Sequence, residues 1–245
     1  MTRKPGPPDL ARLTRRDEIA HGLSAVTERM ARACAAAGRD PAELTLVVVT
    51  KLHPVSDLRL LRELGVRDIG ENRDQEASDK VDAAHAAGIA GLRVHFIGQL
   101  QTNKAGSVTR YADVVHSVDR PKLVRALDRG ALAAGRRVGA LVQVSLDERP
   151  DRGGAAPSAA LDLAALVARS QSLDLLGVMA VAPHHGDPDP AFARLREVAD
   201  EVRGQWPAAT WVSAGMSADL EAAIAHGATH LRVGSAILGT RQPLR

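Results

Sequence analysis

The segment LTLVVVT (Leu44–Thr50) decides between the two folds that its pattern allows. An unbroken run of apolar and β-branched residues is typical of a strand that is buried on both faces of a parallel sheet. A doubly wound dinucleotide-binding sheet carries a G-x-G-x-x-G turn directly after such a strand. Here the strand is followed by KLHP (51–54), which contains no glycine. The segment therefore favours a barrel over an open sheet.

Seven further runs of the same kind follow, and amphipathic stretches with helical spacing separate the runs. The seven units from residue 44 to residue 230 span 186 residues, about 27 each, which is close to the length of a strand with its crossover helix. We expect strands at 44–50, 66–69, 92–97, 113–118, 138–145, 173–181, 210–213 and 230–233, and helices near 56–64, 73–88, 100–111, 120–134, 159–170, 189–204 and 217–226. This order predicts an α/β protein with a TIM-type (β/α)8 barrel.

The chain before the first strand predicts one additional helix. Residues 1–8 contain three prolines and one glycine, which predicts a flexible tail. Residues 9–37 have apolar positions at helical spacing, and Gly38 stands where a helix C-cap is expected. No linker or change of composition follows, so we expect residues 9–245 to form a single barrel domain that is monomeric.

Composition excludes several classes of protein. The net charge of +3 is spread along the chain and aromatic residues make up 2%, so we expect no nucleic-acid partner. The single cysteine, Cys34, excludes a disulfide framework and a cysteine-rich zinc site. No apolar stretch approaches the ~20 residues that span a bilayer, and the N-terminus has no signal-peptide core, so we expect a cytoplasmic protein without a membrane partner. His184, His185 and Asp187 lack a helical i, i+4 pair, and we expect no metal site.

Polar residues at the ends of the predicted strands are the candidate functional residues, because a barrel carries its chemistry at the C-terminal ends of its strands. Lys51 is the most informative of them. Desolvation at the tip of an apolar strand lowers the pKa of a lysine and favours the neutral amine that Schiff-base formation requires. The alternative is a lysine whose ammonium extends to solvent. The other candidates are Glu71, Asn72, His95, Gly98, Ser117, Gln143, Ser145, Met179, Ser213 and residues 232–235.

The loops after the last two strands are candidates for a phosphate site. Ser217 is placed to cap the predicted helix 217–226, and Gly234 and Ser235 open a further short helix. Loops at these two positions of a barrel commonly bind phosphate, although ordinary turns have the same composition. Arg232 lies on the last strand, where a structural ion pair is the alternative to a role in binding.

Several segments together resemble the YggS/PROSC family of pyridoxal-phosphate-binding homeostasis proteins, whose fold is similar to the barrel domain of alanine racemases. The resemblance runs from about residue 9 to residue 241. The matching segments are VVVTKLHP (47–54), DIGENRDQE (68–76), HFIGQLQTNK (95–104), VHSVD (115–119), GVMAVAP (177–183) and SAGMSADLEAAIAHGATHLRVGSAILGTR (213–241).

This resemblance implies pyridoxal phosphate as the cofactor, with Lys51 forming the Schiff base. The other cofactor-binding residues that it implies are Asn72 beside the ring, Arg232 facing the pyridine nitrogen, and Met216, Ser217, Gly234 and Ser235 around the phosphate. It assigns no role to His95. Gln99, Ala214 and Arg152 depart from the residues that are common in the family, so the role of the loop 147–154 is left open.

The function that the resemblance implies is intracellular pyridoxal phosphate homeostasis, in which the cofactor is held on Lys51 and buffered or delivered to pyridoxal-phosphate-dependent apo-enzymes. We expect no catalytic residues, because the only tyrosine, Tyr111, falls in the predicted helix 100–111. Two alternatives stay open. One is a pyridoxal-phosphate-dependent amino-acid racemase, and the other is an aldolase that uses Lys51 on a sugar phosphate without a cofactor.

Overall fold

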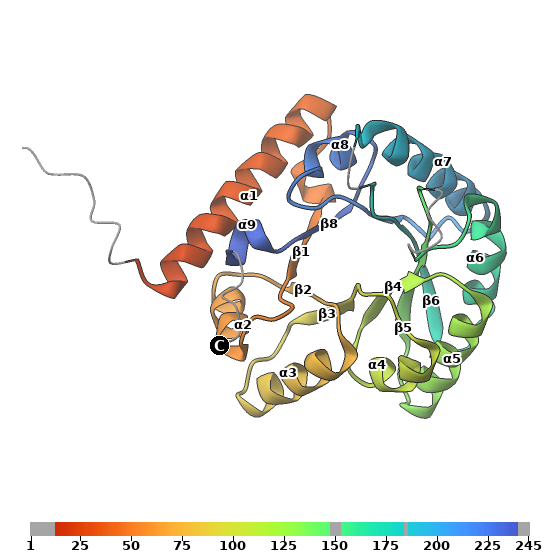
Figure 1. Cartoon of the computed structure of the whole chain (residues 1–245), viewed down its shortest axis with the longest axis horizontal. Helices are drawn as coiled ribbons and strands as arrows, with labels where there is room; N and C mark the ends of the chain where they lie inside the picture. Colours follow the sequence, from red (N-terminus) through yellow and green to blue (C-terminus); the bar gives the residue numbers. More distant parts are fainter. Residues whose placement is uncertain (1–12, 148–152, 184–185, 240–245) are drawn as a thin grey trace, which may run out of the picture.

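The computed structural model describes residues 13–147, 153–183 and 186–239, and these form a closed eight-stranded barrel (Figure 1). Every strand pairs in parallel with the next, and β8 pairs with β1 to close the ring. The strands are β1 (Thr45–Val49), β2 (Asp68–Glu71), β3 (Arg93–Phe96), β4 (Val114–Val118), β5 (Val138–Gln143), β6 (Leu173–Met179), β7 (Trp211–Ser213) and β8 (His230–Val233). The predicted barrel is confirmed.

Helices surround the ring of strands on the outside (Figure 1). Each is amphipathic or apolar and buries its apolar residues against the strands in one continuous core. They are α2 (Val55–Glu63), α3 (Asp74–Ala86), α4 (Ala105–Tyr111), α5 (Pro121–Ala133), α6 (Ala160–Ala168), α7 (Asp189–Gln205) and α8 (Leu220–Ala225), with short 3-10 turns η2 (Pro41–Glu43), η3 (Thr102–Lys104) and η4 (Pro157–Ala159).

The predicted boundaries of the second strand, 66–69, are wrong by two residues. The backbone N–H of Val66 donates to the carbonyl of Leu61, after Gly65 at φ 90°, so Val66 takes part in the capping turn that follows α2. The strand therefore begins at Asp68, and Glu71 becomes its last, fully buried residue instead of following it. The predicted helix 100–111 is also divided into η3 and α4.

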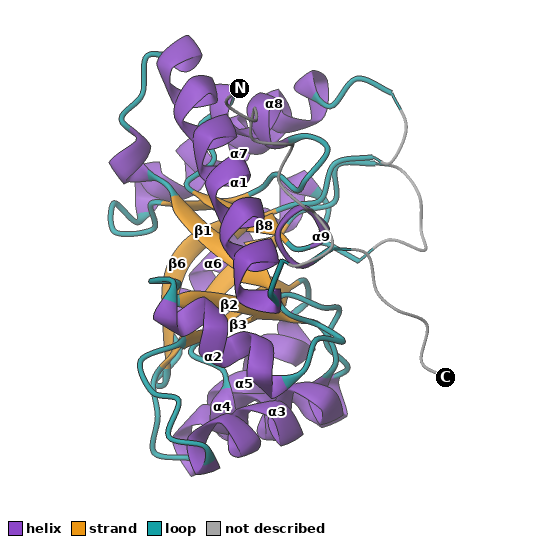
Figure 2. Ribbon diagram, turned by 90° about the vertical axis from the view of Figure 1, so that its left-hand side faces the viewer, coloured by secondary structure: helices purple, strands orange, loops and turns teal. Residues whose placement is uncertain are grey.

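The additional N-terminal helix, α1 (Arg15–Ala37), packs against α8 and the short α9 (Ser235–Leu238), as Figure 2 shows. Thr14 begins α1 with a capping box that includes Asp17, and Gly38 ends it in the left-handed conformation at φ 65°, as predicted. Residues 9–12, and the predicted tail 1–8, lie outside the described residues. Because α9 follows β8 directly, α1 covers the outer side of the last loop of the barrel.

Gly22 of α1 permits this contact. A Cβ atom on Gly22 would lie 2.7 Å from both Cα and the carbonyl oxygen of Ile237 in α9. These are backbone atoms, so no change of rotamer can relieve the clash. We expect Gly22→Ala to push α1 away from α9 and to lower the free energy of unfolding by about 1–3 kcal/mol. Urea unfolding measures this.

Gly204 is the matched control for this substitution. It also lies in a helix, α7, but a Cβ atom there meets nothing within 4 Å. Gly204→Ala should raise the free energy of unfolding by up to about 1 kcal/mol, since alanine is the better helix former. Equal effects of the two substitutions would show that α1 does not contact α9 closely.

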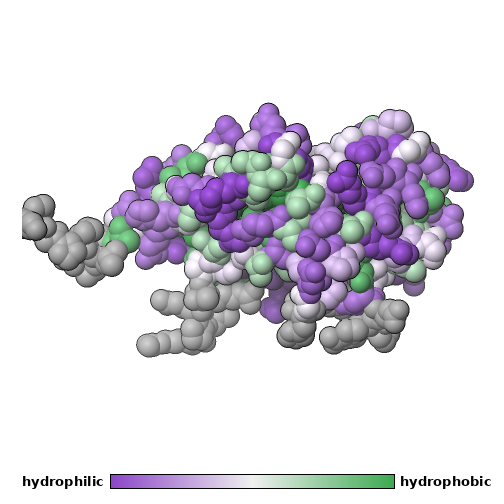
Figure 3. Space-filling view, turned by 90° about the horizontal axis from the view of Figure 1, so that it is seen from above, coloured by the Kyte–Doolittle hydropathy of each residue, from purple (hydrophilic) through white to green (hydrophobic). Residues whose placement is uncertain are grey.

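The described surface carries few large apolar side chains. Leu13, Leu52 and Leu132 are the exposed ones among the described residues, and the face in Figure 3 is mostly hydrophilic with scattered hydrophobic residues. No helix in the described part of the chain is long and apolar enough to cross a membrane.

Candidate functional site

A cavity of about 500 Å³ lies where the C-terminal ends of β1 and β8 meet. This volume is within the range of small-molecule sites. The residues that line it are Val49, Lys51, His53, Ile97, Met216, Ser217, Ala218, Arg232, Gly234, Ser235 and Gly239. Six of the seven residues expected at a cofactor site are among them, and they come from β8 and from the segments that follow β1, β7 and β8.

The seventh residue, Asn72, is not brought into this cavity. It follows β2 and lines a neighbouring cavity of about 530 Å³, together with polar residues of the loops after β2 and β3. Gly98 packs closely on the backbone of Asn72, since a Cβ atom at Gly98 would lie 2.1 Å from the Asn72 carbonyl oxygen. The expected place of Asn72 beside a ring bound to Lys51 therefore stays untested.

Lys51 is presented by a turn that is held on both sides. Before it, the carbonyl of Thr50 accepts a hydrogen bond of 2.7 Å from Nζ of Lys80. After it, the backbone N–H of Leu52 donates to Oε1 of Glu76, and Leu52 has φ 63°, the only positive φ among the described non-glycine residues. A leucine rarely adopts this conformation, so the contacts with α3 hold a strained turn in place. Lys51 itself is half-buried.

The residues that hold the turn form a buried charged cluster beneath Lys51. Nζ of Lys80 lies 2.8 Å from Oε1 of Glu71 and 3.0 Å from Oε1 of Glu76, and the Thr50 hydroxyl donates to the same Glu71 oxygen at 2.6 Å. Burial raises the pKa of Glu71, and the charge of Lys80 opposes this effect only in part. Neither Lys80 nor Glu76 was among the residues predicted from the sequence, because both lie within a helix instead of at a strand end.

The loop after β7 does not form as predicted. Ser217 is not the cap of a helix over 217–226, because α8 begins only at Leu220 and its N-cap is Asp219. The carboxylate of Asp219 instead accepts from the backbone N–H of Met216 at 2.6 Å, which closes a turn over residues 216–219. This turn leaves Ser217 at the wall of the cavity. The predicted helix that opens after Gly234 is confirmed as α9.

Gly234 allows β8 to approach β1 at the cavity. A Cβ atom at this position would lie 3.0 Å from the carbonyl oxygen of Val49 and 3.1 Å from its Cβ atom. A side chain there would push the two strand ends apart and fill the space between them. The glycine thus keeps open a cradle beside Lys51 and Ser235.

Arg232 lies on the wall of the cavity and is nearly fully buried. Its Nη1 donates to Oγ of Ser213 at 2.6 Å, and its Nη2 donates to the carbonyl of Ala180 at 2.8 Å. The alternative of a structural ion pair is wrong for the described residues, none of which places a carboxylate within 4 Å of this guanidinium. Burial accordingly lowers the pKa of Arg232 to about 10.

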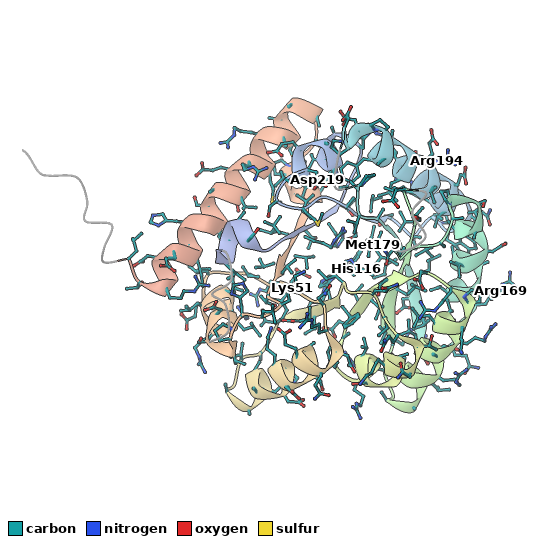
Figure 4. The ribbon with its side chains drawn as sticks, viewed as in Figure 1. Lys51, His116, Arg169, Met179, Arg194 and Asp219 are labelled. Carbon is teal, nitrogen blue, oxygen red and sulfur yellow. The ribbon has the colours of Figure 1, made fainter. Side chains whose placement is uncertain are left out.

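Polar side chains also fill the interior of the barrel below this wall. Figure 4 shows His116 of β4 inside the ring of strands, whereas Arg169 and Arg194 point outward. Nδ1 of His116 lies 2.9 Å from the Ser213 hydroxyl, and its Nε2 lies 2.8 Å from Nδ1 of His95. Sequence reasoning missed His116. The signal that could have found it is its central place in the fourth apolar strand, where a buried imidazole needs partners.

The remaining candidates lie outside the cavity. Gln143 donates to the carbonyl of Gly153, and the Ser145 hydroxyl donates to the carbonyl of Asp147, so both support the loop after β5. The hydroxyl of Tyr111 donates to Asp74 at 3.4 Å, and burial raises the pKa of this phenol. His184, His185 and Arg152 lie outside the described residues. Within the described ranges, no group of three His, Cys, Asp or Glu side chains is arranged to hold a metal ion.

Known proteins are similar to this chain in sequence and in architecture. The family model "Alanine racemase, N-terminal domain" matches residues 22–242. The curated pyridoxal phosphate homeostasis protein of Mycobacterium tuberculosis is 43% identical over 244 residues, which cover 93% of this chain and 95% of that protein. The structure of PipY of Synechococcus elongatus PCC7942 with pyridoxal phosphate bound is 33% identical with a TM-score of 0.77, and the match covers 90% of this chain and 100% of that one.

An alanine racemase of Clostridium difficile 630 shares the fold alone. It is 12% identical with a TM-score of 0.70, and the match covers 90% of this chain but 56% of the racemase. The high identity to the homeostasis proteins extends over nearly the whole of both chains. The chain therefore belongs to the alanine racemase N-terminal domain family and, within it, to the pyridoxal phosphate homeostasis proteins.

Proposed function

We propose that this protein binds pyridoxal phosphate on Lys51 and serves as a reservoir that buffers the cofactor or delivers it to apo-enzymes. The observation that carries this proposal is the convergence of Lys51, Arg232 and the loops after β7 and β8 on one cavity. The PipY structure with pyridoxal phosphate bound, at 33% identity, supports it.

The donor set suits this cofactor. A lysine amine reacts with an aldehyde, an arginine donates hydrogen bonds to a ring nitrogen, and short loops with small residues bind phosphate. The cofactor supplies the aldehyde, with which a neutral amine condenses to a Schiff base with loss of one water molecule. In this cavity Lys51 provides the amine. The phosphate of the cofactor is bound by the Met216 backbone, Ser217, Gly234 and Ser235. Arg232 provides the donor for the ring nitrogen.

The residues of the site favour binding over catalysis. An arginine opposite the ring nitrogen disfavours protonation of that nitrogen, which weakens the electron-withdrawing power of the cofactor. A racemase also needs a proton-transfer group on each face of its substrate. The phenol of Tyr111 cannot serve as one, because it is buried against Asp74 outside the cavity. We therefore infer that the protein is not an enzyme. As expected from the sequence, we also propose that it acts as a monomer and works in the cytoplasm.

The test is to load the protein with pyridoxal phosphate, remove free cofactor by gel filtration, and divide the sample. One half is mixed with a pyridoxal-phosphate-dependent apo-enzyme, and we expect that enzyme to regain activity as the protein loses its cofactor. The other half is incubated with L-alanine or D-alanine, and we expect no time-dependent change in circular dichroism. Sustained racemisation would establish the rival enzymatic function, and failure to retain any cofactor would refute both.

A further inference from the structure

A file of hydrogen-bonded polar side chains crosses the barrel from its N-terminal end to the cavity. Nε2 of His95 lies 2.9 Å from Oδ1 of Asp68, the first residue of β2. The file continues from Nδ1 of His95 to Nε2 of His116 at 2.8 Å, and from Nδ1 of His116 to the Ser213 hydroxyl at 2.9 Å. It ends where Nη1 of Arg232 donates to that hydroxyl oxygen at 2.6 Å. Five strands, β2, β3, β4, β7 and β8, thus contribute to a connection between Asp68 and the cavity wall.

The two ends of the file fix the direction of every hydrogen bond in it. An arginine can only donate and an ionised carboxylate can only accept. The carboxylate requires a proton on Nε2 of His95, which leaves Nδ1 as an acceptor. His116 must then donate from Nε2 and accept at Nδ1, so the hydroxyl of Ser213 donates to it. With both imidazoles neutral, every nitrogen and oxygen in the file has a partner.

The ionisation of the groups agrees with this direction. Burial, together with the charge of Arg232, lowers the pKa of His116 well below its usual value. Burial raises the pKa of Asp68, but the hydrogen bond from His95 and the nearby charge of Arg93 oppose this effect, and the net pKa is lowered. A neutral His116 and an ionised Asp68 are the states that the hydrogen-bond directions require.

The file matters to the cavity because Arg232 has no carboxylate beside it in the described structure. Its orientation depends on two acceptors, the Ser213 hydroxyl and the Ala180 carbonyl. The Ser213 oxygen is a better acceptor when its own proton is donated onward, because successive hydrogen bonds polarise one another. The carboxylate of Asp68, at the first residue of β2, is the negative end of that series.

We propose that Asp68, His95, His116 and Ser213 act as positioning residues for Arg232, and that they fix its guanidinium toward the ring nitrogen of the bound cofactor. This inference rests on the proposed binding of pyridoxal phosphate. It assigns a role to His95 and His116, which do not line the cavity. The barrel interior, and not the cavity wall alone, then determines how the cofactor ring is held.

The first test needs no cofactor. Long-range proton–nitrogen correlation NMR of the 15N-labelled apoprotein at neutral pH reports which ring nitrogen carries the proton, with His95→Gln and His116→Gln for assignment. We expect both histidines to be neutral and protonated on Nε2. A proton on Nδ1 of either ring would overturn the direction of the file. In Asp68→Asn the amide can donate as well as accept, and we expect the Nδ1-protonated form of His116 to appear; unchanged tautomers would show that Asp68 does not set them.

The second test measures the effect on the cofactor. Ser213→Ala removes the acceptor of Nη1 without altering a residue that lines the cavity, and we expect the Kd for pyridoxal phosphate to rise about tenfold. With cofactor labelled at the ring nitrogen, we also expect its 15N resonance to move toward that of a protonated pyridine. A folded Ser213→Ala protein with wild-type Kd and resonance would overturn the proposal.

Ser117→Ala is the matched control. Ser117 is also a buried serine of a barrel strand, but its hydroxyl has no partner in the file or elsewhere in the described structure. For Ser117→Ala we expect the Kd for pyridoxal phosphate and the 15N resonance of the cofactor ring nitrogen to remain those of the wild type. Changes in these two quantities equal to those in Ser213→Ala would overturn the role of the file. Wild-type protein that binds no pyridoxal phosphate would refute the proposed function, whereas wrong tautomers in a protein that does bind it would refute the positioning file alone.

Discussion

Replacement of Lys51 by methionine should abolish the retention of pyridoxal phosphate through gel filtration and the visible absorbance of the loaded protein. Lys51 is the one amine among the described residues that line the cavity, and methionine keeps most of the length of the side chain while removing the nucleophile. Hydrogen bonds from Arg232 and the phosphate loops remain in this variant, so weak and reversible binding should persist. The measurement is the visible spectrum before and after removal of free cofactor.

Lys122→Met is the control for this experiment. Lys122 lies exposed in the first turn of α5, away from the cavity, and its replacement should leave the spectrum unchanged. The unfolding transition of each variant shows whether it is folded. If folded Lys51→Met protein keeps the visible band after gel filtration, Lys51 is not the residue that holds the cofactor.

Replacement of Lys80 by methionine should have the largest effect on stability. It leaves Glu71, which is fully buried, with the Thr50 hydroxyl as its remaining partner among the described contacts. Loss of one partner of a buried ion pair destabilises a protein by about 3–5 kcal/mol, because the other charge stays desolvated. The turn that presents Lys51 should loosen as well, since Lys80 holds the Thr50 carbonyl. Urea unfolding at pH 7 measures the loss of stability, and the rate of cofactor binding reports the loosening of the turn.

The pH dependence of the stability of Lys80→Met should show that the buried carboxylate of Glu71 causes the destabilisation. Without Lys80, the pKa of Glu71 in the folded protein rises further above that in the unfolded chain. The folded state then binds more protons, so the destabilisation should shrink as the pH falls from 7 to 5. Glu71→Gln in the Lys80→Met background should restore most of the stability.

Lys104→Met serves as the comparison, because Lys104 is half-exposed and lies 3.8 Å from Asp74. Because the ammonium of Lys104 keeps its contact with solvent and lies far from the carboxylate for an ion pair, the loss of this pair should cost less than about 1 kcal/mol at any pH. If Lys80→Met costs no more than Lys104→Met, or if its cost grows on acidification, the cluster beneath Lys51 does not bear a buried charge.

The sequence predicted the fold and the place of the cavity because both follow from local patterns. Continuous apolar runs at regular spacing predict parallel strands, and parallel strands bring the residues that follow them to one end of a barrel. Lys51, Arg232 and Gly234 could be found in this way. The apolar runs, and the 3.6-residue period of the stretches between them, carry this information without any knowledge of distant contacts.

The parts that could not be predicted depend on contacts between distant segments. The contacts that hold the turn at Lys51 join the loop after β1 to α3, and His116 meets Ser213, which lies 97 residues further along the chain. The N-cap of α8 went to Asp219 instead of Ser217, because the carboxylate of Asp219 closes a turn on Met216. Two residue types with equal capping preference are separated only by this tertiary geometry.

The central claim is that the amine of Lys51 is the covalent site of pyridoxal phosphate. The most direct measurement is peptide mass spectrometry after the loaded protein is reduced with borohydride and digested. We predict a pyridoxyl-phosphate adduct on the peptide that contains Lys51 and on no other lysine. An adduct on a different lysine, a sugar-phosphate fragment on Lys51, or an unmodified Lys51 after saturation with cofactor would contradict the account.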